Sequence, residues 1–157
     1  GSFRNVRRRM ELRGTVEREG RAIAVYDDFA HHPTAIRTTL DGLRNKLDDA
    51  GKKSERILAA FEPRSNTMKL GVMAAQLPWS LESADLSFCH TAGLDWDVAA
   101  ALAPMGERAR LAGAIEPLVK QIVAEARPGD HIVCMSNGGF GGVHDKLLAA
   151  LKAAAAS

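Results

Sequence analysis

The chain has 157 residues, of which 46% are hydrophobic and 25% charged, and its formal net charge is +2 at pH 7. This length and composition suit one compact domain with an ordinary hydrophobic core. They argue against a membrane span, because no window approaches the roughly 18 consecutive apolar residues that a span needs. The amino-terminal residues also lack the apolar stretch of a signal peptide. We therefore expect a cytoplasmic protein with no membrane partner.

Basic residues cluster near the amino terminus, where residues 4–9 read RNVRRR. A nucleic-acid-binding arm is one interpretation of such a run. However, no aromatic residues interrupt it and no second basic stripe continues it, so we expect no nucleic-acid partner. We interpret residues 1–9 as a cloning scar, Gly1 and Ser2, followed by an interdomain linker. Residues 10–157 would then form a single domain.

The predicted elements alternate between strands and helices. Two strands, at 10–17 and 21–27, flank the turn sequence REG and form a hairpin. A helix then runs from Pro33 to a stop at Gly51, with apolar residues at helical spacing between them. The remaining predictions are a strand at 56–61, a helix at 67–79 that ends near Pro78, a strand at 84–90, a weak helix at 97–102, a short strand at 109–111, a helix at 115–126, a strand at 131–135 and a helix at 143–155.

Strands that are separated by helices favour parallel pairing through right-handed crossovers. We therefore predict a three-layer α/β fold with a mostly parallel sheet, to which the first hairpin adds one antiparallel edge contribution. The only two cysteines, Cys89 and Cys134, fall inside predicted strands. That position suits reduced thiols in the core better than a disulfide.

Four polar clusters follow predicted strands: DDFAHHPT (27–34), EPRSNT (62–67), HTAGLDW (90–96) and SNGGFGG (136–142). The carboxyl ends of parallel strands share one edge, where open α/β folds bind their ligands. A binding site at this edge is the hypothesis, and ordinary polar loops are the alternative.

Each cluster allows a chemical and a structural interpretation. The glycines of SNGGFGG can bring backbone N–H groups to an anion at a helix start, or they form only a flexible turn. They are not a dinucleotide fingerprint, because His144 stands at the third glycine position. Arg64 could hold a carboxylate through two hydrogen bonds, or it is a surface arginine. Between the second strand and the first helix, the joint contains Asp27, Asp28, His31 and His32. These residues could bind a metal, act as acids and bases, or cap the following helix. Their spacing does not distinguish these three alternatives.

Longer segments resemble a known family. FRNVRRRMELRG, VYDDFAHHPTAI, FEPRSNTMK and MSNGGFGGVH are similar to segments of the carboxy-terminal domain of the Mur ligases, over Phe3 to about Leu151. The resemblance implies an amino-terminal domain for a UDP-sugar, a central P-loop domain for ATP, and a dinucleotide-binding-like third domain that receives an amine. Such ligases phosphorylate a carboxylate from ATP with Mg²⁺, and the amine attacks the acyl phosphate. This chain contains no G-x-x-x-x-G-K-[ST], so we expect the third domain alone, inactive by itself.

The resemblance also implies roles for residues at the strand ends. Arg9 and Asp28 would contact the ATP ribose when the domains close, and His31 and His32 would lie beside the phosphates and magnesium as catalytic positioning groups. ATP and Mg²⁺ would be held mainly by the absent central domain, with no metal cage in this chain. The acceptor would meet Arg64, Ser65, Asn66, Thr67, Ser136, Asn137, Gly138 and Gly139.

Departures from the motifs of related ligases narrow the range of acceptor substrates that we expect. Phe29 and EPRSNT stand where L-alanine-adding ligases carry DDYGHHP and a His-Arg pair, and HTAGLDW stands where diaminopimelate-adding ligases carry a DNPR motif. We therefore expect a ligase that joins the tripeptide L-alanyl-γ-D-glutamyl-meso-diaminopimelate to UDP-N-acetylmuramate in peptidoglycan recycling. One alternative is another Mur ligase, such as the L-alanine-adding enzyme. The others are a module that senses nucleotides without catalysis, and a metal-dependent phosphohydrolase at the DDFAHH joint with further ligands from His90 or Asp95.

Overall fold

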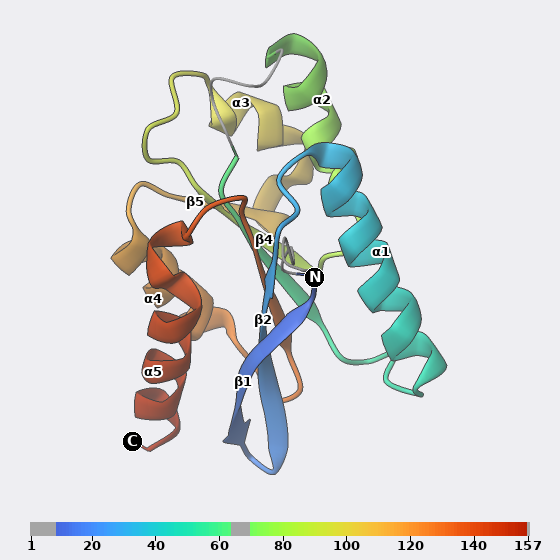
Figure 1. Cartoon of the computed structure of the whole chain (residues 1–157), viewed down its shortest axis with the longest axis vertical. Coiled ribbons are helices and arrows are strands. Elements are labelled where there is room, and N and C mark those ends of the chain that lie inside the picture. Colours follow the sequence, from blue (N-terminus) through green and yellow to red (C-terminus); the bar gives the residue numbers. More distant parts are fainter. Residues whose placement is uncertain (1–8, 64–69, 157) are drawn as a thin grey trace, which may run out of the picture.

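A computed structural model describes residues 9–63 and 70–156 of the chain (Figure 1). In these residues six strands form one sheet in the order β1-β2-β6-β3-β4-β5. The strands are β1 (Glu11–Arg18), β2 (Arg21–Asp28), β3 (Ile57–Phe61), β4 (Leu86–His90), β5 (Ala109–Ala112) and β6 (His131–Met135). The helices are α1 (Pro33–Asp49), α2 (Leu70–Ser80), α3 (Val98–Leu102), α4 (Ile115–Glu125) and α5 (Val143–Ala155), with 3₁₀ turns η1 (Ala103–Arg108) and η2 (Phe140–Gly142).

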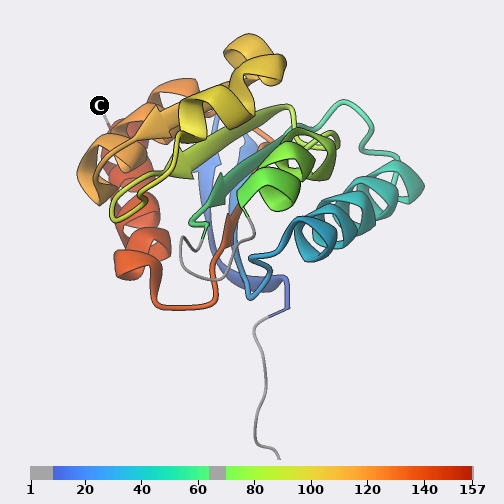
Figure 2. The same ribbon diagram turned by 90° about the horizontal axis from the view of Figure 1, so that it is seen from above.

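The sheet pairing confirms the predicted fold class. β1 pairs antiparallel with β2 at one edge, and every other neighbouring pair is parallel. Helices α1, α2 and α3 cover one face of the sheet, and α4 and α5 cover the other (Figure 2). Within the described ranges, no helix combines the length and the apolar character that crossing a membrane would require.

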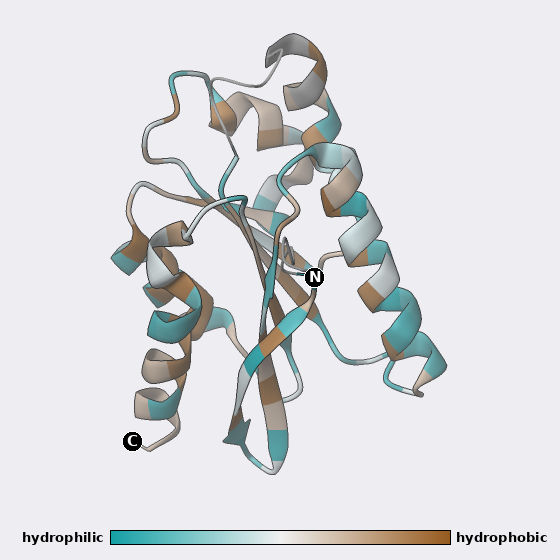
Figure 3. Cartoon of the chain, viewed as in Figure 1, coloured by the Kyte–Doolittle hydropathy of each residue, from teal (hydrophilic) through white to brown (hydrophobic). Residues whose placement is uncertain are grey.

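The two faces of the sheet carry separate hydrophobic cores, because successive side chains of a strand point in opposite directions. Ile57, Ala59 and Phe61 of β3 pack toward α1 and α2, whereas Leu58 and Ala60 pack toward α4 and α5. Both faces are covered, so β3 is hydrophobic throughout its length and β6 is hydrophobic after His131 (Figure 3). Cys89 and Cys134 are free thiols in these cores, as predicted, and burial raises the pKa of each.

Helix α1 forms where its sequence predicts. Ile36, Leu40, Leu43 and Leu47 are spaced three or four residues apart and all are buried against the sheet. Pro33 occupies the first turn, where its missing N–H costs no helical hydrogen bond. The chain leaves the helix through a left-handed residue that favours glycine, Gly51 at φ +76°.

Helix α2 ends at Ser80, one residue beyond the predicted range and two beyond Pro78. Pro78 removes only one backbone donor, and it lies in the last turn, so little of the helix follows it. The amide of Leu81 then closes the end by donating to the carbonyls of Leu77 and Pro78. The start that we predicted for this helix, at residue 67, lies outside the described residues.

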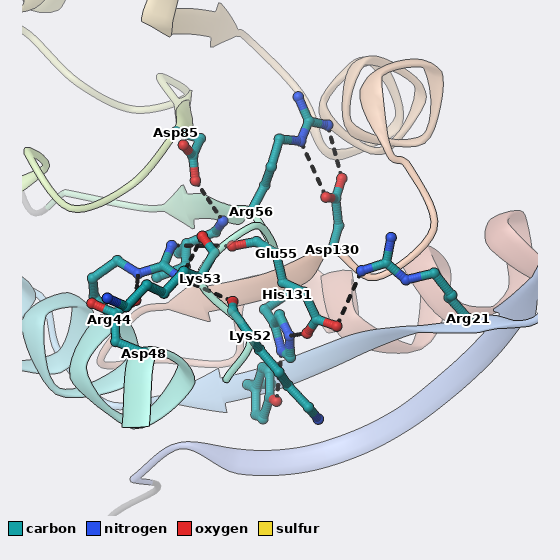
Figure 4. Close-up of polar contacts among 12 residues, drawn as sticks. Arg21, Arg44, Asp48, Lys52, Lys53, Glu55, Arg56, Asp85, Asp130 and His131 are labelled. Atoms are coloured by element: carbon teal, nitrogen blue, oxygen red, sulfur yellow. Dashed lines mark hydrogen bonds and ion pairs between the residues drawn. The ribbon is translucent and has the colours of Figure 1, made fainter. Parts of the chain in front are cut away.

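A polar network joins three strands at the amino-terminal edge of the sheet (Figure 4). His131 lies 2.7 Å from Glu55 through Nε2 and 3.0 Å from the Tyr26 hydroxyl through Nδ1, and Arg21 donates to Glu55 at 3.2 Å. Burial alone raises the pKa of Glu55. Hydrogen bonds from His131 and Arg21, together with nearby positive charge, outweigh that effect and lower the pKa below its ordinary value. The ionised carboxylate therefore stabilises the fold.

We predict that Glu55→Gln lowers the free energy of unfolding at neutral pH by about 1.5–3 kcal/mol, because it removes hydrogen bonds to a charged group. A lowered folded pKa gives stability that is present above the ordinary carboxyl pKa and is lost as the pH falls through the folded pKa. Urea titrations should therefore separate the two proteins at pH 7 and bring them together near pH 3. A gap of equal size at both pH values would contradict this account.

Glu82→Gln is the matched control for this experiment. Glu82 pairs with Arg37, but its side chain is 59% exposed. Exposed ion pairs contribute little, so this substitution should cost less than about 1 kcal/mol at either pH.

Candidate functional site

The strand ends that follow β2, β6, β3 and β4 lie side by side at the carboxyl edge of the sheet. Met135 of β6 is opposite both Asp28 of β2 and Phe61 of β3, and Phe61 is opposite Cys89 of β4. The parallel topology thus brings the described members of the polar clusters to one edge, as the sequence predicts. Arg64, Ser65, Asn66 and Thr67 lie outside the described residues.

The Asp28 carboxylate accepts three hydrogen bonds. It is 5% exposed, and its Oδ1 accepts from the Ala30 amide at 2.8 Å and from the Thr39 hydroxyl at 3.2 Å. Its Oδ2 accepts from the Met10 amide at 2.9 Å. Met10 has a φ of +44°, which is unusual for a residue with a side chain. Asp28 therefore holds together the chain that enters β1 at Met10 (the entering chain), the joint after β2, and α1.

A groove of about 680 Å³ runs beside Asp28 between the entering chain, β2 and α1. Arg9, Asp28, His31 and His32 line the end near the start of α1, and side chains of the helix form one wall. Its volume is in the range of pockets that bind small molecules and cofactors. The predicted nucleotide residues thus share one concave surface.

The rings of the two joint histidines are in contact but tilted by 44° to each other, with centroids 4.1 Å apart. The Nδ1 of His31 donates to the Phe29 carbonyl at 3.0 Å, which leaves its Nε2 as the other polar atom of the ring. His32 is the N-cap residue of α1, but its side chain makes no capping hydrogen bond. Burial, and secondly the positive charge of a protonated His31, lower the pKa of His32. His32 is therefore neutral at pH 7.

The joint does not gather its acids and histidines around one point. Asp27 and Asp28 are consecutive strand residues and so face opposite sides of the sheet. Asp27 lies 3.7 Å from the Arg13 guanidinium, whereas Asp28 faces α1 and accepts from Thr39. Within residues 9–63 and 70–156, no group of three or more His, Cys, Asp or Glu side chains could hold a metal ion. The geometry does not support the phosphohydrolase alternative.

A second polar group lies at the same edge on the face of α4 and α5. The Ser136 hydroxyl donates to Glu62 Oε1 at 2.8 Å, and the Gly138 amide donates to Ser136 Oγ at 3.0 Å. His90 Nδ1 is 3.2 Å from Glu62 Oε2, and the His90 ring stacks on Phe140. Ser136 and Gly138 are predicted acceptor residues, and Asn137 and Gly139 belong to the same loop.

Glu62 and His90 are members of this group that the sequence reasoning did not select as acceptor residues. Glu62 is part of EPRSNT, but only the later residues of that motif were chosen, and His90 was considered only as a metal ligand. Their positions could have identified them, because Glu62 follows Phe61 and His90 follows Cys89, and the sheet register aligns Phe61 with Cys89. That identification requires the strand register, which the sequence does not display.

The loop after Ser136 requires one of its glycines for steric reasons. Gly141 has a φ of +57°, and a Cβ atom there would lie 2.8 Å from Cγ1 of Ile115. A side chain at this position would therefore strain the backbone and collide with α4. The glycine lets the loop pass α4 and enter α5.

An α/β domain with a groove of this size at the carboxyl edge of its sheet is typical of domains that bind small molecules there. Residues 8–138 match the Mur ligase, glutamate ligase domain family. The chain therefore belongs to the Mur ligases, and its fold is that of their carboxy-terminal domain.

Two curated relatives share nearly the whole chain. The chain is 49% identical over 149 residues to the UDP-N-acetylmuramate–L-alanyl-gamma-D-glutamyl-meso-2,6-diaminoheptandioate ligase of Escherichia coli K12, covering 94% of this chain and 31% of that protein. It is 46% identical over 153 residues to the ligase of the same name from Haemophilus influenzae, covering 97% of this chain and 32% of that protein. The chain thus spans about a third of the length of these relatives.

A solved structure agrees with this similarity. The murein peptide ligase of Psychrobacter arcticus is 43% identical and superimposes with a TM-score of 0.77 over 92% of this chain and 30% of that one.

We predict that Asp28→Asn destabilises the domain by about 1–3 kcal/mol, because the new amide group must face the backbone N–H of either Met10 or Ala30 and leave it without an acceptor. Urea unfolding would measure the loss, and hydrogen exchange should be faster at the Met10 or Ala30 amide. Asp48→Asn is the control, because the Asp48 carboxylate is 37% exposed in its pair with Arg44. That change should cost less than about 1 kcal/mol. Equal stability of Asp28→Asn and the parent would refute the anchoring role.

Proposed function

We propose that this chain is the acceptor-receiving domain of an ATP-dependent ligase that joins L-alanyl-γ-D-glutamyl-meso-diaminopimelate to UDP-N-acetylmuramate through an acyl phosphate. The observation that carries the proposal is the 49% identity, over almost the whole chain, to the E. coli ligase whose name specifies these substrates. In this proposal the linker to a central domain lies within residues 1–9, after Gly1 and Ser2, and residues 10–157 are the carboxy-terminal domain. The reaction belongs to cytoplasmic peptidoglycan recycling.

The nucleotide role of Asp28 is compatible with its hydrogen bonding. A carboxylate offers about four acceptor positions, and Met10, Ala30 and Thr39 occupy three of them. One position remains for a ribose hydroxyl, and Arg9 lines the same groove. Ribose binding and chain anchoring can therefore share one side chain.

The histidines of the joint suit a positioning role beside the phosphates. His31 is oriented by the Phe29 carbonyl, and His32 is neutral at neutral pH because its pKa is lowered. A neutral imidazole can donate one hydrogen bond to a phosphate oxygen. ATP and Mg²⁺ would be held mainly by the central domain, with these side chains closing the site.

The acceptor would be received on the other face of the edge. The loop of residues 136–139 lies beside Glu62, to which the Ser136 hydroxyl donates, and Arg64 through Thr67 follow Glu62 after Pro63 in the sequence. Their side chains and backbone N–H groups include hydrogen-bond donors. Donors of this kind recognise the carboxylates of a peptide. Nucleotide and acceptor would thus approach opposite faces of one sheet edge.

The proposal predicts that the full-length protein forms ADP and UDP-N-acetylmuramyl tripeptide from ATP, Mg²⁺, UDP-N-acetylmuramate and the free tripeptide. Mass spectrometry of the nucleotide-linked product, with L-alanine and diaminopimelate as competing acceptors, would measure selectivity. The tripeptide should have the highest kcat/KM by at least about tenfold, a transition-state preference of about 1.4 kcal/mol. Better turnover of L-alanine would favour an L-alanine-adding enzyme instead.

The isolated chain should bind ATP only weakly, with a Kd of about 1 mM or weaker, equivalent to roughly 4 kcal/mol. The physical reason is that the phosphates contribute much of the affinity for ATP, and this sequence has no P-loop to hold them. Calorimetry of the chain and of the full-length protein would make the comparison. Micromolar binding by the chain alone would favour a nucleotide-sensing module.

A further inference from the structure

Glu62, His90 and Ser136 form a hydrogen-bonded group at the carboxyl ends of β3, β4 and β6. Each directly follows one of three aligned residues, Phe61, Cys89 and Met135, so all three side chains point to the face of α4 and α5. The His90 and Glu62 side chains are 10% and 29% exposed, and Ser136 is buried. The group is therefore largely buried, with Glu62 as its most exposed member.

The carboxylate of Glu62 orients the imidazole of His90. A carboxylate only accepts hydrogen bonds, so His90 Nδ1 carries the proton that points to Glu62 Oε2 at 3.2 Å, and Nε2 carries the lone pair. The Ser136 hydroxyl holds the other carboxylate oxygen, and Phe140 stacks against the ring. Within the described residues, Nδ1 is the ring nitrogen of His90 for which a protein partner is seen.

We propose that His90 is the base that deprotonates the incoming amine, and that Glu62 is its positioning residue. This inference rests on the proposed ligase function. An α-amine has an ordinary pKa of about 8, so at neutral pH most of the acceptor is ammonium and has no lone pair for attack. Imidazole is the side chain best suited to remove such a proton near neutral pH.

The step balances as follows. Nε2 of His90 takes one proton from the ammonium and becomes imidazolium, which Glu62 stabilises. The free amine forms a C–N bond with the carbonyl carbon of the acyl phosphate, and the C–O bond to phosphate breaks. The second proton of the nitrogen leaves with the phosphate as HPO₄²⁻, and His90 returns its proton to water.

Other titratable groups at the edge are less suited to this task. His31 and His32 belong to the α1 side with the nucleotide groove. The Cys89 thiol is buried, which raises its pKa and keeps it protonated. Around His90 itself, the charged group among its described contacts is Glu62, since Ser136 and Phe140 carry no charge.

Two acceptors used with the full-length ligase would test the proposal. Hydroxylamine captures the acyl phosphate as a hydroxamate and is already unprotonated at neutral pH, so it needs no base. His90→Asn retains an N–H donor near the Nδ1 position but has no basic nitrogen. At pH 7 it should lower kcat for the tripeptide about 10²- to 10⁴-fold while hydroxamate formation is unchanged. The tripeptide defect should shrink as the pH approaches and passes the amine pKa.

Two further variants give the comparison its controls. Glu62→Gln keeps an oxygen that accepts from Nδ1 but loses the charge, so its tripeptide defect should be smaller and in the same direction. Glu82→Gln alters another carboxylate, which pairs with Arg37 of α1 and is 59% exposed. Per folded molecule, this control should leave both reactions unchanged.

Three results would overturn the proposal. An equal loss with both acceptors in His90→Asn would place His90 in structure or in acyl phosphate formation. A raised tripeptide KM with an unchanged kcat and pH profile would make the group an ammonium anchor rather than a base. If the parent enzyme itself forms neither hydroxamate nor coupled product, the proposed ligase function fails, and this inference fails with it.

Discussion

The hydrogen-bond register of β6 with its two parallel neighbours is the constraint on which the rest of the structure depends. Met135 is aligned with Asp28 on one side and with Phe61 on the other. A slip of one residue would turn every side chain of a strand to the opposite face. Ser136 would then lose Glu62, and its amide would no longer donate to the Asp28 carbonyl. One register therefore fixes both halves of the candidate site.

Much of the fold follows from local sequence signals. The apolar spacing of α1, the hairpin around Gly20 and the buried β3 are each visible within a single segment, because their periodicity reflects the face that each buries. Their alternation then implies a parallel sheet. The end of α2 was less predictable, because a proline in a last turn does not stop the helix when later amides can still find carbonyls, as Leu81 does.

The site was predictable in its location but not in its contacts. Sequence order identifies strand ends, and a parallel sheet gathers them at one edge. However, the partners Glu62 and Ser136 are 74 residues apart, and Glu55 and His131 are 76 apart. Which of Asp27 and Asp28 faces α1 depends on the pleat, not on residue type. Pairings of this kind arise only once distant strands are aligned.

The central claim is that the nucleotide meets the α1 side of the edge while the acceptor amine meets the α4 and α5 side. A crystal structure of the full-length ligase with an ATP analogue and a phosphinate mimic of the tetrahedral intermediate would test it most directly. The account predicts a ribose hydroxyl on Asp28, and the atom that replaces the attacking nitrogen within about 3.5 Å of His90 Nε2. An acceptor group bound on the α1 side of the edge, remote from His90, would contradict it.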